Sequence, residues 1–186
     1  MVYELQPFNQ ARFDACMAWV AKLFDRTLSQ YEAVKIHALA DALHVVKYHR
    51  AIIGGTFRKL RHGPVALDAL NRAKAWKEDA KAPMGLSATR GNAMYFARKS
   101  GPTHESMFTE SERGAILQAA RTAFGMTFDE SQRFFHGESG RPNDYLGRAW
   151  QSTPGENALI SWETILTAYA AEAGVDAGEL KALVCA

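Results

Sequence analysis

Apolar side chains recur every three or four residues along most of the chain, and this spacing predicts amphipathic helices. The first such stretch covers about residues 9–24, and its apolar positions fall on one face. The second begins after Ser29 and runs to about residue 48, with apolar residues over a much wider face. A face that wide is typical of a helix surrounded by other elements. We therefore expect residues 30–48 to form the central helix of the fold.

Short polar motifs mark where several helices begin. A Ser or Thr followed three residues later by Glu forms a capping box, in which the hydroxyl and the carboxylate each bind a free backbone N–H. Three such pairs, and a weaker one led by Asp, precede predicted helices: Ser29 and Glu32, Thr109 and Glu112, Thr127 and Glu130, Asp176 and Glu179. A further helix is predicted over about residues 158–173.

A basic, extended stretch interrupts the helical pattern after the central helix. Gly54 and Gly55 permit backbone angles closed to other residues, so they predict a sharp turn. Residues 56–61 then alternate apolar and cationic side chains, as a short strand does. Gly63 and Pro64 end this strand. Because Pro has a preset φ and lacks an N–H, we expect Pro64 to be the first residue of the next helix.

The predicted fold is mainly α, a single helical domain with a small antiparallel β element. The helix that starts at Pro64 should extend over about residues 65–80. A second strand is predicted in "AMYFARK", residues 93–99, because turn residues flank it on both sides. Pairing this strand with residues 56–61 would give the small antiparallel sheet.

Composition and the absence of internal breaks favour one globular domain. Hydrophobic residues make up 47% and charged residues 23% of the chain, which are ordinary globular values. No repeat or low-complexity linker divides residues 1–186, and the core should span about residues 10–167. The sequence shows neither a signal-peptide pattern nor an apolar run long enough for a bilayer. We expect a cytoplasmic protein without a membrane partner, in which Cys16 and Cys185 are reduced, structural thiols.

The net charge of +2 hides an uneven distribution. Residues 47–77, here called the basic segment, hold eight Lys or Arg and a single acid, Asp68. Such a cluster accelerates encounter with an acidic partner, whether a protein or a nucleic acid. For nucleic acid, the cations would bind phosphates while Tyr48 or Phe57 stacked on bases. No helix-turn-helix or RNA-binding signature accompanies the segment, and a solvated basic face explains it as well.

Candidate catalytic and metal-binding groups are few. His37, Asp41 and His44 share one face of the central helix and could hold Zn²⁺ or Fe²⁺ if a fourth ligand joined them. Their spacing is not that of a His-Glu-x-x-His site, and we favour a buried polar network that ties the helix to the glycine turn. Cys16 lies in an amphipathic helix, and the Gly54-Gly55 pair lacks the phosphate-loop frame. We expect no enzyme, no metal and no cofactor.

Taken as a unit, residues 35–70 resemble the core of the SocA-like antitoxin family, also called the Panacea domain. The pattern is a Lys-containing helix with an Asp and a nearby His, a turn with a glycine, an aromatic extended segment, and Gly-Pro-Val before a helix. His49 and Ala51 depart from it, since glycine and proline are common there. The matching residues are, in order, Lys35, Asp41, His44, Tyr48, Arg50, Ile53, Gly54, Phe57, Gly63, Pro64 and Val65.

The second half of the chain is similar to the same family. Residues 108–139 resemble its Ser/Thr-x-x-Glu helix and the small helix after Gly-Met. His136 and Trp150 stand where the family has a downstream His and Trp. The resemblance thus covers most of residues 10–167. It implies structural support, and no mapped active site, for the matching residues that we single out as the structural motif: Asp41, His44, Gly54, Gly63 and Pro64.

The resemblance implies a non-catalytic, bacterial or phage protein that neutralises a cognate toxin by direct binding. One studied type of member delivers its toxin to a AAA+ protease, so that mode is also implied. From the charge distribution we expect the partner-binding residues to be Arg58, Lys59, Arg61 and His62, facing an acidic toxin surface. The alternative is a nucleic-acid-associated regulator that uses the basic segment.

Overall fold

The computed structural model describes residues 6–76, 86–90, 93–96 and 105–184, with backbone only at 86–90, 93–96 and 181–184. The predicted mainly α class with a small antiparallel β element is confirmed. In chain order the elements are α1 (Gln10–Leu23), β1 (Leu28–Ser29), α2 (Gln30–Tyr48), β2 (Phe57–Leu60), β3 (Gly63–Ala66), α3 (Leu67–Ala75), β4 (Leu86–Arg90), β5 (Ala93–Phe96), a 3₁₀ turn (Glu105–Met107), α4 (Glu110–Phe124), α5 (Phe128–Phe135), α6 (Tyr145–Ser152), α7 (Trp162–Ala173) and α8 (Ala177–Val184).

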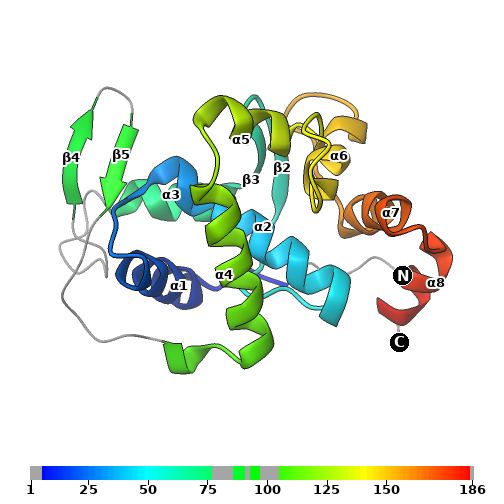
Figure 1. The fold of residues 1–186 in the computed structure, drawn as a ribbon, viewed down its shortest axis with the longest axis horizontal. Helices are drawn as coiled ribbons and strands as arrows, with labels where there is room; N and C mark the ends of the chain where they lie inside the picture. The colour runs from blue at the N-terminus through cyan, green and yellow to red at the C-terminus, as the bar shows by residue number, and fades with distance from the viewer. Residues whose placement is uncertain (1–5, 77–85, 91–92, 97–104, 185–186) are drawn as a thin grey trace.

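Helix α2 is central, as its wide apolar face predicts. Every residue from Ala33 to Val46 is buried. Figure 1 shows α4 crossing in front of α2; α3 also packs on α2, and α1 contacts both α3 and α4. Most buried apolar side chains in the described part of the chain belong to one hydrophobic cluster around this helix. None of the described helices is long and apolar enough to cross a membrane.

The predicted capping boxes set the starts of three helices. The reciprocal hydrogen bonds between hydroxyl and carboxylate partners are present at the first turns of α2, α4 and α5. At the start of α8, Asp176 accepts from the backbone N–H groups of Gly178 and Glu179. These starts were predictable because each depends on two side chains only three residues apart.

Pro64 is not the first residue of a helix, which corrects the prediction. It lies in β3, opposite Lys59 in a two-stranded antiparallel hairpin, and α3 begins at Leu67. The N–H and C=O of Lys59 instead bond outward, to Ala158 and Asn157. Pro64 therefore occupies a strand position at which no ladder N–H is required, and its missing donor costs nothing.

The predicted pairing of residues 56–61 with 93–99 is wrong. β2 pairs with β3 across the two-residue loop Arg61–His62, whereas β5 pairs with β1 and β4. Closing a two-residue loop costs less conformational entropy than closing a loop of about thirty residues. Pairing of β2 with the adjacent β3 is therefore favoured. The free edge of β2 is covered by residues 157–160. Residues 97–99 of the predicted strand lie outside the described residues.

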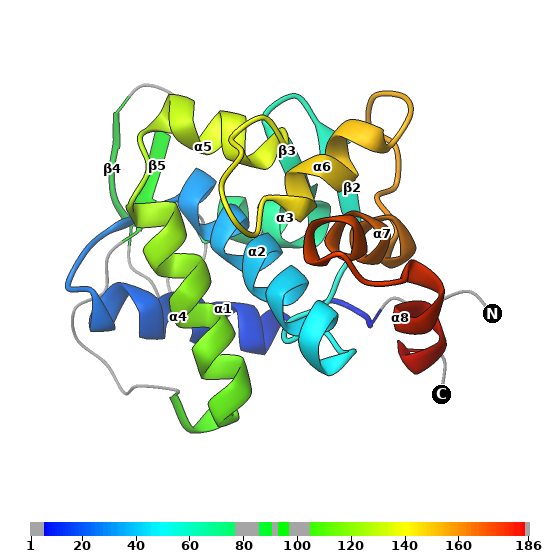
Figure 2. The same cartoon turned by 45° about the vertical axis from the view of Figure 1, so that its right-hand side comes forward.

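Two helix boundaries and one whole helix also differ from the prediction. α3 ends at Ala75, and residues 77–80 of the predicted helix lie outside the described residues. α7 starts at Trp162, not at 158, because residues 157–160 run along β2. α6 was not predicted; it packs between β3 and α7, as Figure 2 shows.

Candidate functional site

Asp41 fixes the turn that follows α2. Its Oδ1 accepts the backbone N–H groups of Ile52 and Ile53, both at 2.9 Å, and its Oδ2 accepts that of Gly54 at 2.7 Å. His37 Nε2 lies 3.2 Å from Asp41 Oδ2 and 3.0 Å from Gly54 O. Because both neighbours accept, Nε2 carries the proton. This is the polar network between helix and glycine turn that the sequence led us to favour.

His44 ties α2 to two other segments. Its Nδ1 donates to the backbone carbonyl of Arg50 at 2.7 Å, so its Nε2 accepts from the Ser111 hydroxyl at 3.2 Å. Asp41 thus binds the backbone of residues 52–54, whereas His44 binds Arg50 and Ser111, so the two side chains do not bind a common point. No group of three His, Cys, Asp or Glu that could hold a metal ion occurs in the described part of the chain.

Lys35 attaches the other end of the hairpin to α2. Its side chain is fully buried, and Nζ donates to the carbonyl of Pro64 at 3.0 Å. Nζ also lies 4.7 Å from the ring centroid of Phe135 and 5.4 Å from that of Tyr31. Burial lowers the pKa of the Lys35 ammonium well below its usual value. No ion pair joins Lys35 to a carboxylate among the described residues.

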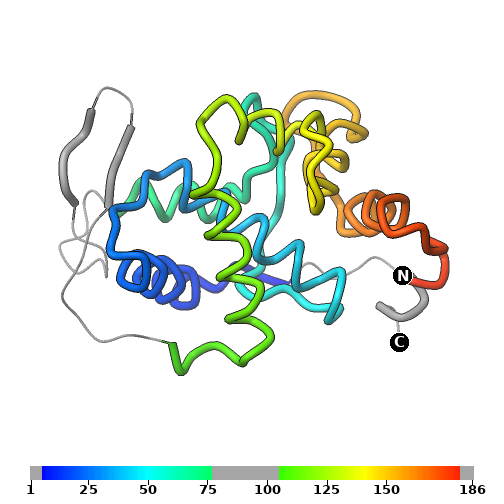
Figure 3. The backbone as a smooth tube through the Cα atoms, viewed as in Figure 1, coloured from blue at the N-terminus to red at the C-terminus, as the bar shows by residue number. Residues whose placement is uncertain are grey.

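Gly63 leaves the space that the Lys35 amine occupies. Its φ is +95°, and a Cβ at this position would lie 2.8 Å from Lys35 Nζ and 2.8 Å from Phe135 Cβ. Gly54, in the turn after α2, is also a position that only glycine fits. Its φ is +81°, and a Cβ there would meet the backbone oxygens of Gln6 and Pro7. Figure 3 shows the chain leaving α2, turning back along it and entering the hairpin. The turn before the hairpin is therefore bound to α2 at Asp41, and the hairpin itself is bound to α2 at Lys35.

The four predicted partner-binding residues have two different roles. Arg58 donates to the carbonyl of Asn157 at 3.0 Å. Lys59 Nζ donates to the carbonyls of Thr153 at 2.7 Å and Gln151 at 3.3 Å. These two cations hold the segment after α6 against the hairpin. Arg61 and His62 form the exposed two-residue loop between β2 and β3.

The basic segment does not form one continuous surface. Arg72 is paired with Asp14, and Arg50 lies 3.4 Å from Glu112. Lys47 is exposed near the end of α2, while the hairpin loop lies beside the first turns of that helix, at the opposite end in Figure 1. Lys77 lies outside the described residues. The cations are thus divided among separate places along the length of α2.

A stacked pair braces the hairpin from the side. The rings of His136 and Trp150 are 4.2 Å apart and nearly parallel. Trp150 Nε1 donates to the carbonyl of Leu60 at 2.9 Å, and Lys59 Nζ lies 4.6 Å from the indole centroid. Burial, followed by the nearby Lys35, lowers the pKa of His136. The two residues that matched the downstream part of the family pattern therefore contact each other and the hairpin.

Exposed side chains next to the hairpin loop come from α5. The His62 ring bonds to Gln132 and lies 6.1 Å from the ring of Phe128. Phe128 is 54% exposed, more than any other large apolar side chain in the described part of the chain. Its ring is 5.2 Å from that of Tyr31. We call Arg61, His62, Phe128 and Gln132, together with the adjoining pocket, the hairpin–α5 face.

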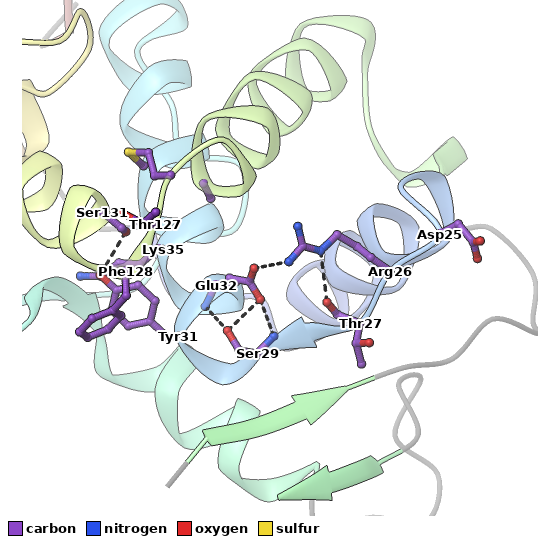
Figure 4. A pocket seen from close by; sticks show the side chains of 12 residues that line it. Asp25, Arg26, Thr27, Ser29, Tyr31, Glu32, Lys35, Thr127, Phe128 and Ser131 are labelled. Atoms are coloured by element: carbon purple, nitrogen blue, oxygen red, sulfur yellow. Dashed lines mark hydrogen bonds and ion pairs between the residues drawn. The ribbon is translucent and has the colours of Figure 1, made fainter. Parts of the chain in front are cut away.

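The adjoining pocket has a volume of about 830 Å³ and lies between the first turns of α2 and α5 and the end of α4. Figure 4 shows Tyr31, Lys35, Phe128 and Ser131 gathered at one end and Arg26 towards the other. The Tyr31 hydroxyl is 3.2 Å from Ser131 Oγ. Burial raises the pKa of Tyr31, and the bond with Ser131 opposes that change. Sequence reasoning missed this pocket because its walls come from segments about a hundred residues apart.

No protein-family model matches the chain, and no curated protein or solved structure matches it either. The fold and the site together define a mainly helical protein that holds an exposed hairpin loop, an exposed aromatic side chain and a pocket on a buried polar framework.

Proposed function

We propose that this chain is an antitoxin of the SocA-like family, which binds a cognate protein toxin in the cytoplasm through the hairpin–α5 face. The observation that carries the proposal is the coupling of the residues on which the resemblance rests. Lys35 bonds to Pro64, Asp41 to Gly54, and His44 to the carbonyl of Arg50. A set of matches that form one framework supports a shared fold better than the same number of scattered matches.

A binding role also agrees with the chemistry of the pocket. Neither His nor Cys lines it. Ser29 donates to Glu32 within the capping box, and Glu32 also binds Arg26 at 2.6 Å. Glu32 is therefore committed to helix capping and to Arg26, and the lining offers no His–Ser or His–Cys pair for nucleophilic catalysis. We infer a protein that recognises another macromolecule and transforms no substrate.

The exposed chemistry favours an acidic protein partner with an apolar contact. Arg61 and His62 present the hairpin loop, and Phe128 offers an apolar ring beside them. Aromatic and Arg side chains are the residues that most often dominate protein–protein binding. The nucleic-acid alternative has less support, because the cations of the basic segment are divided and Arg58, Lys59 and Arg72 bind groups of the fold itself.

Coexpression with the product of the adjacent gene tests the function. We expect that product to stop growth when expressed alone and to be harmless together with this chain. Arg61→Glu combined with Phe128→Asp should abolish the rescue, because both changes oppose an acidic, partly apolar surface. Lys74→Glu, which alters an exposed cation on α3, is the matched control and should rescue like the wild type.

Two outcomes would contradict the proposal: the absence of any toxic neighbour that this chain neutralises, or full rescue by the double variant. The amount of toxin protein in the coexpressing cells distinguishes neutralisation by binding alone from delivery to a protease. A masked toxin accumulates in a complex with the chain, whereas a toxin delivered to a AAA+ protease disappears unless the protease is removed.

A further inference from the structure

The end of the pocket near Lys35 contains a buried amine and no acid. The acid nearest in sequence, Glu32, uses Oε1 for Arg26 and Oε2 for the N–H and hydroxyl of Ser29. Arg26 is thereby compensated, while Lys35 is not. Buried cations in proteins are normally paired with an anion, so this arrangement is short of one negative charge whenever Lys35 is protonated.

Hydrogen-bond donors remain uncommitted at the same place. Lys35 Nζ carries two N–H donors as a neutral amine and three when protonated, and Pro64 is the single acceptor bonded to it among the described residues. Tyr31 and Ser131 share one hydrogen bond between two hydroxyls, so one of the two hydroxyl protons is left over. A carboxylate, which only accepts, can bind both the left-over hydroxyl proton and the free N–H groups of Lys35.

The charge of the site indicates a monoanion. Among the described residues that line this end of the pocket, Lys35 is the group that can carry a positive charge without a counter-ion, since Arg26 is held by Glu32. A phosphate dianion would bring more negative charge than this end of the pocket can balance. Burial lowers the pKa of Lys35, and an entering carboxylate would restore a counter-ion to the protonated amine.

We propose that the pocket receives an Asp or Glu side chain of the protein partner, which binds Lys35 and the hydroxyl pair of Tyr31 and Ser131. The partner is favoured over a free small acid because the pocket is continuous with Phe128 and with the hairpin loop of Arg61 and His62. Its volume of about 830 Å³ accommodates a chain segment and not merely one carboxylate. An apolar residue beside the acid would lie on Phe128.

The inference rests on the proposed function for the origin of the acidic side chain, but the pocket can be tested alone. The probes are acetyl-Leu-Glu-Leu-amide and the same peptide with Gln in place of Glu, titrated while backbone amide resonances are recorded. With the wild type we expect saturable shifts near residues 29–35 and 126–131. The Glu peptide should bind about tenfold or more tightly than the Gln peptide, as expected for a charge-assisted hydrogen bond.

Lys35→Met should remove the preference for Glu over Gln, and Lys47→Met, an exposed lysine near the end of the same helix, should keep it. Tyr31→Phe is the second variant, because it keeps the ring and loses the hydroxyl. Its preference for the Glu peptide over the Gln peptide should be several-fold smaller than that of the wild type. A wild type that binds both peptides equally, or that responds more strongly to inorganic phosphate than to the Glu peptide, would overturn the proposal. So would a folded Lys35→Met that still prefers Glu.

The toxin gives the second arm. If Lys35→Met neutralises the toxin with unchanged affinity, the pocket proposal fails and the antitoxin function stands. If the peptide preference is found while even the wild type neutralises no neighbouring toxin, the antitoxin function fails and the carboxylate pocket stands. We expect at least a tenfold weaker complex for Lys35→Met and an unchanged one for Lys47→Met.

Discussion

At the scale of single residues, replacing either of two glycines by alanine should change the free energy of unfolding in opposite directions, because their surroundings differ. Gly54 has φ +81°, and a Cβ there would lie 2.6 Å from the carbonyl oxygen of Gln6. Gly114 lies inside α4 with nothing within 4 Å of the same position. Gly54→Ala should lower the free energy of unfolding by about 2 kcal/mol or more. Gly114→Ala should raise it by about 0.5–1 kcal/mol, because it lowers the entropy of the unfolded chain in a helix position.

Denaturant unfolding of the two variants beside the wild type measures both effects. Gly63→Ala should behave like Gly54→Ala, since its φ is +95° and its Cβ would meet Lys35 and Phe135. Equal stability of Gly54→Ala and Gly114→Ala would mean that the turn after α2 is not built as described.

Lys35 should make stability depend on pH. Burial lowers its pKa in the folded protein, whereas the unfolded chain keeps a pKa of about 10.4. Between these two values the unfolded state binds one proton more, so the free energy of unfolding rises with pH over that window. Lys35→Met lacks this titration, so its free energy of unfolding should not rise in the same way. The free energy of unfolding of the wild type, relative to that of Lys35→Met, should therefore increase by up to about 1.4 kcal/mol per pH unit within the window.

Urea unfolding of both proteins at several values from about pH 7 to pH 9 provides the comparison, below the range in which tyrosines of the unfolded chain ionise. Lys47→Met serves as the control, because Lys47 is exposed. Parallel pH profiles for the wild type and Lys35→Met would show that Lys35 keeps an ordinary pKa in the folded protein.

At the scale of elements, one buried carboxylate holds α3 against α1. Asp14 accepts from Arg72 and, at 2.9 Å, from the indole N–H of Trp76. Asp14→Ala removes the buried acceptor shared by Arg72 and Trp76, so we expect a loss of about 3 kcal/mol. Lys74→Ala, an exposed change on α3, should stay within about 0.5 kcal/mol of the wild type. Thermal melting decides the point, and an Asp14→Ala protein as stable as Lys74→Ala would refute it.

The elements that could be predicted are those specified locally. The starts of α2, α4 and α5 follow from pairs of side chains three residues apart, and the burial of α2 follows from its wide apolar face. β3 could not be predicted, because Pro64 in a strand is tolerated only through the outward bonds of Lys59 to a segment about a hundred residues away. α6, with eight residues, is too short for helical periodicity to stand out.

The candidate site was predictable only in part for the same reason. The charge pattern predicted the same partner-binding role for Arg58, Lys59, Arg61 and His62. In the structure, Arg58 and Lys59 instead donate to backbone carbonyls between Gln151 and Asn157. Distant segments decide which cations remain exposed. The importance of Phe128 is likewise absent from its local pattern, since it depends on Tyr31 and His62 being brought beside it.

At the scale of the whole molecule, the buried framework and the exposed face are parts of one arrangement. Lys35 holds the hairpin on α2, Asp41 holds the turn that leads into it, and the stacked His136 and Trp150 brace it from the end of α5 and from α6. A loop held this firmly loses little conformational freedom on binding, which favours affinity. We therefore propose that recognition occurs at the hairpin–α5 face, and not at the end of α2 around Tyr48.

Hydrogen–deuterium exchange of the purified chain, alone and together with the toxin that we propose is encoded beside it, tests this placement most directly. Complex formation should slow exchange in residues 25–35, 61–63 and 126–132 and leave α7 and the end of α2 unchanged. Protection concentrated on α7 or around Tyr48, or the absence of any complex with that protein, would contradict the account.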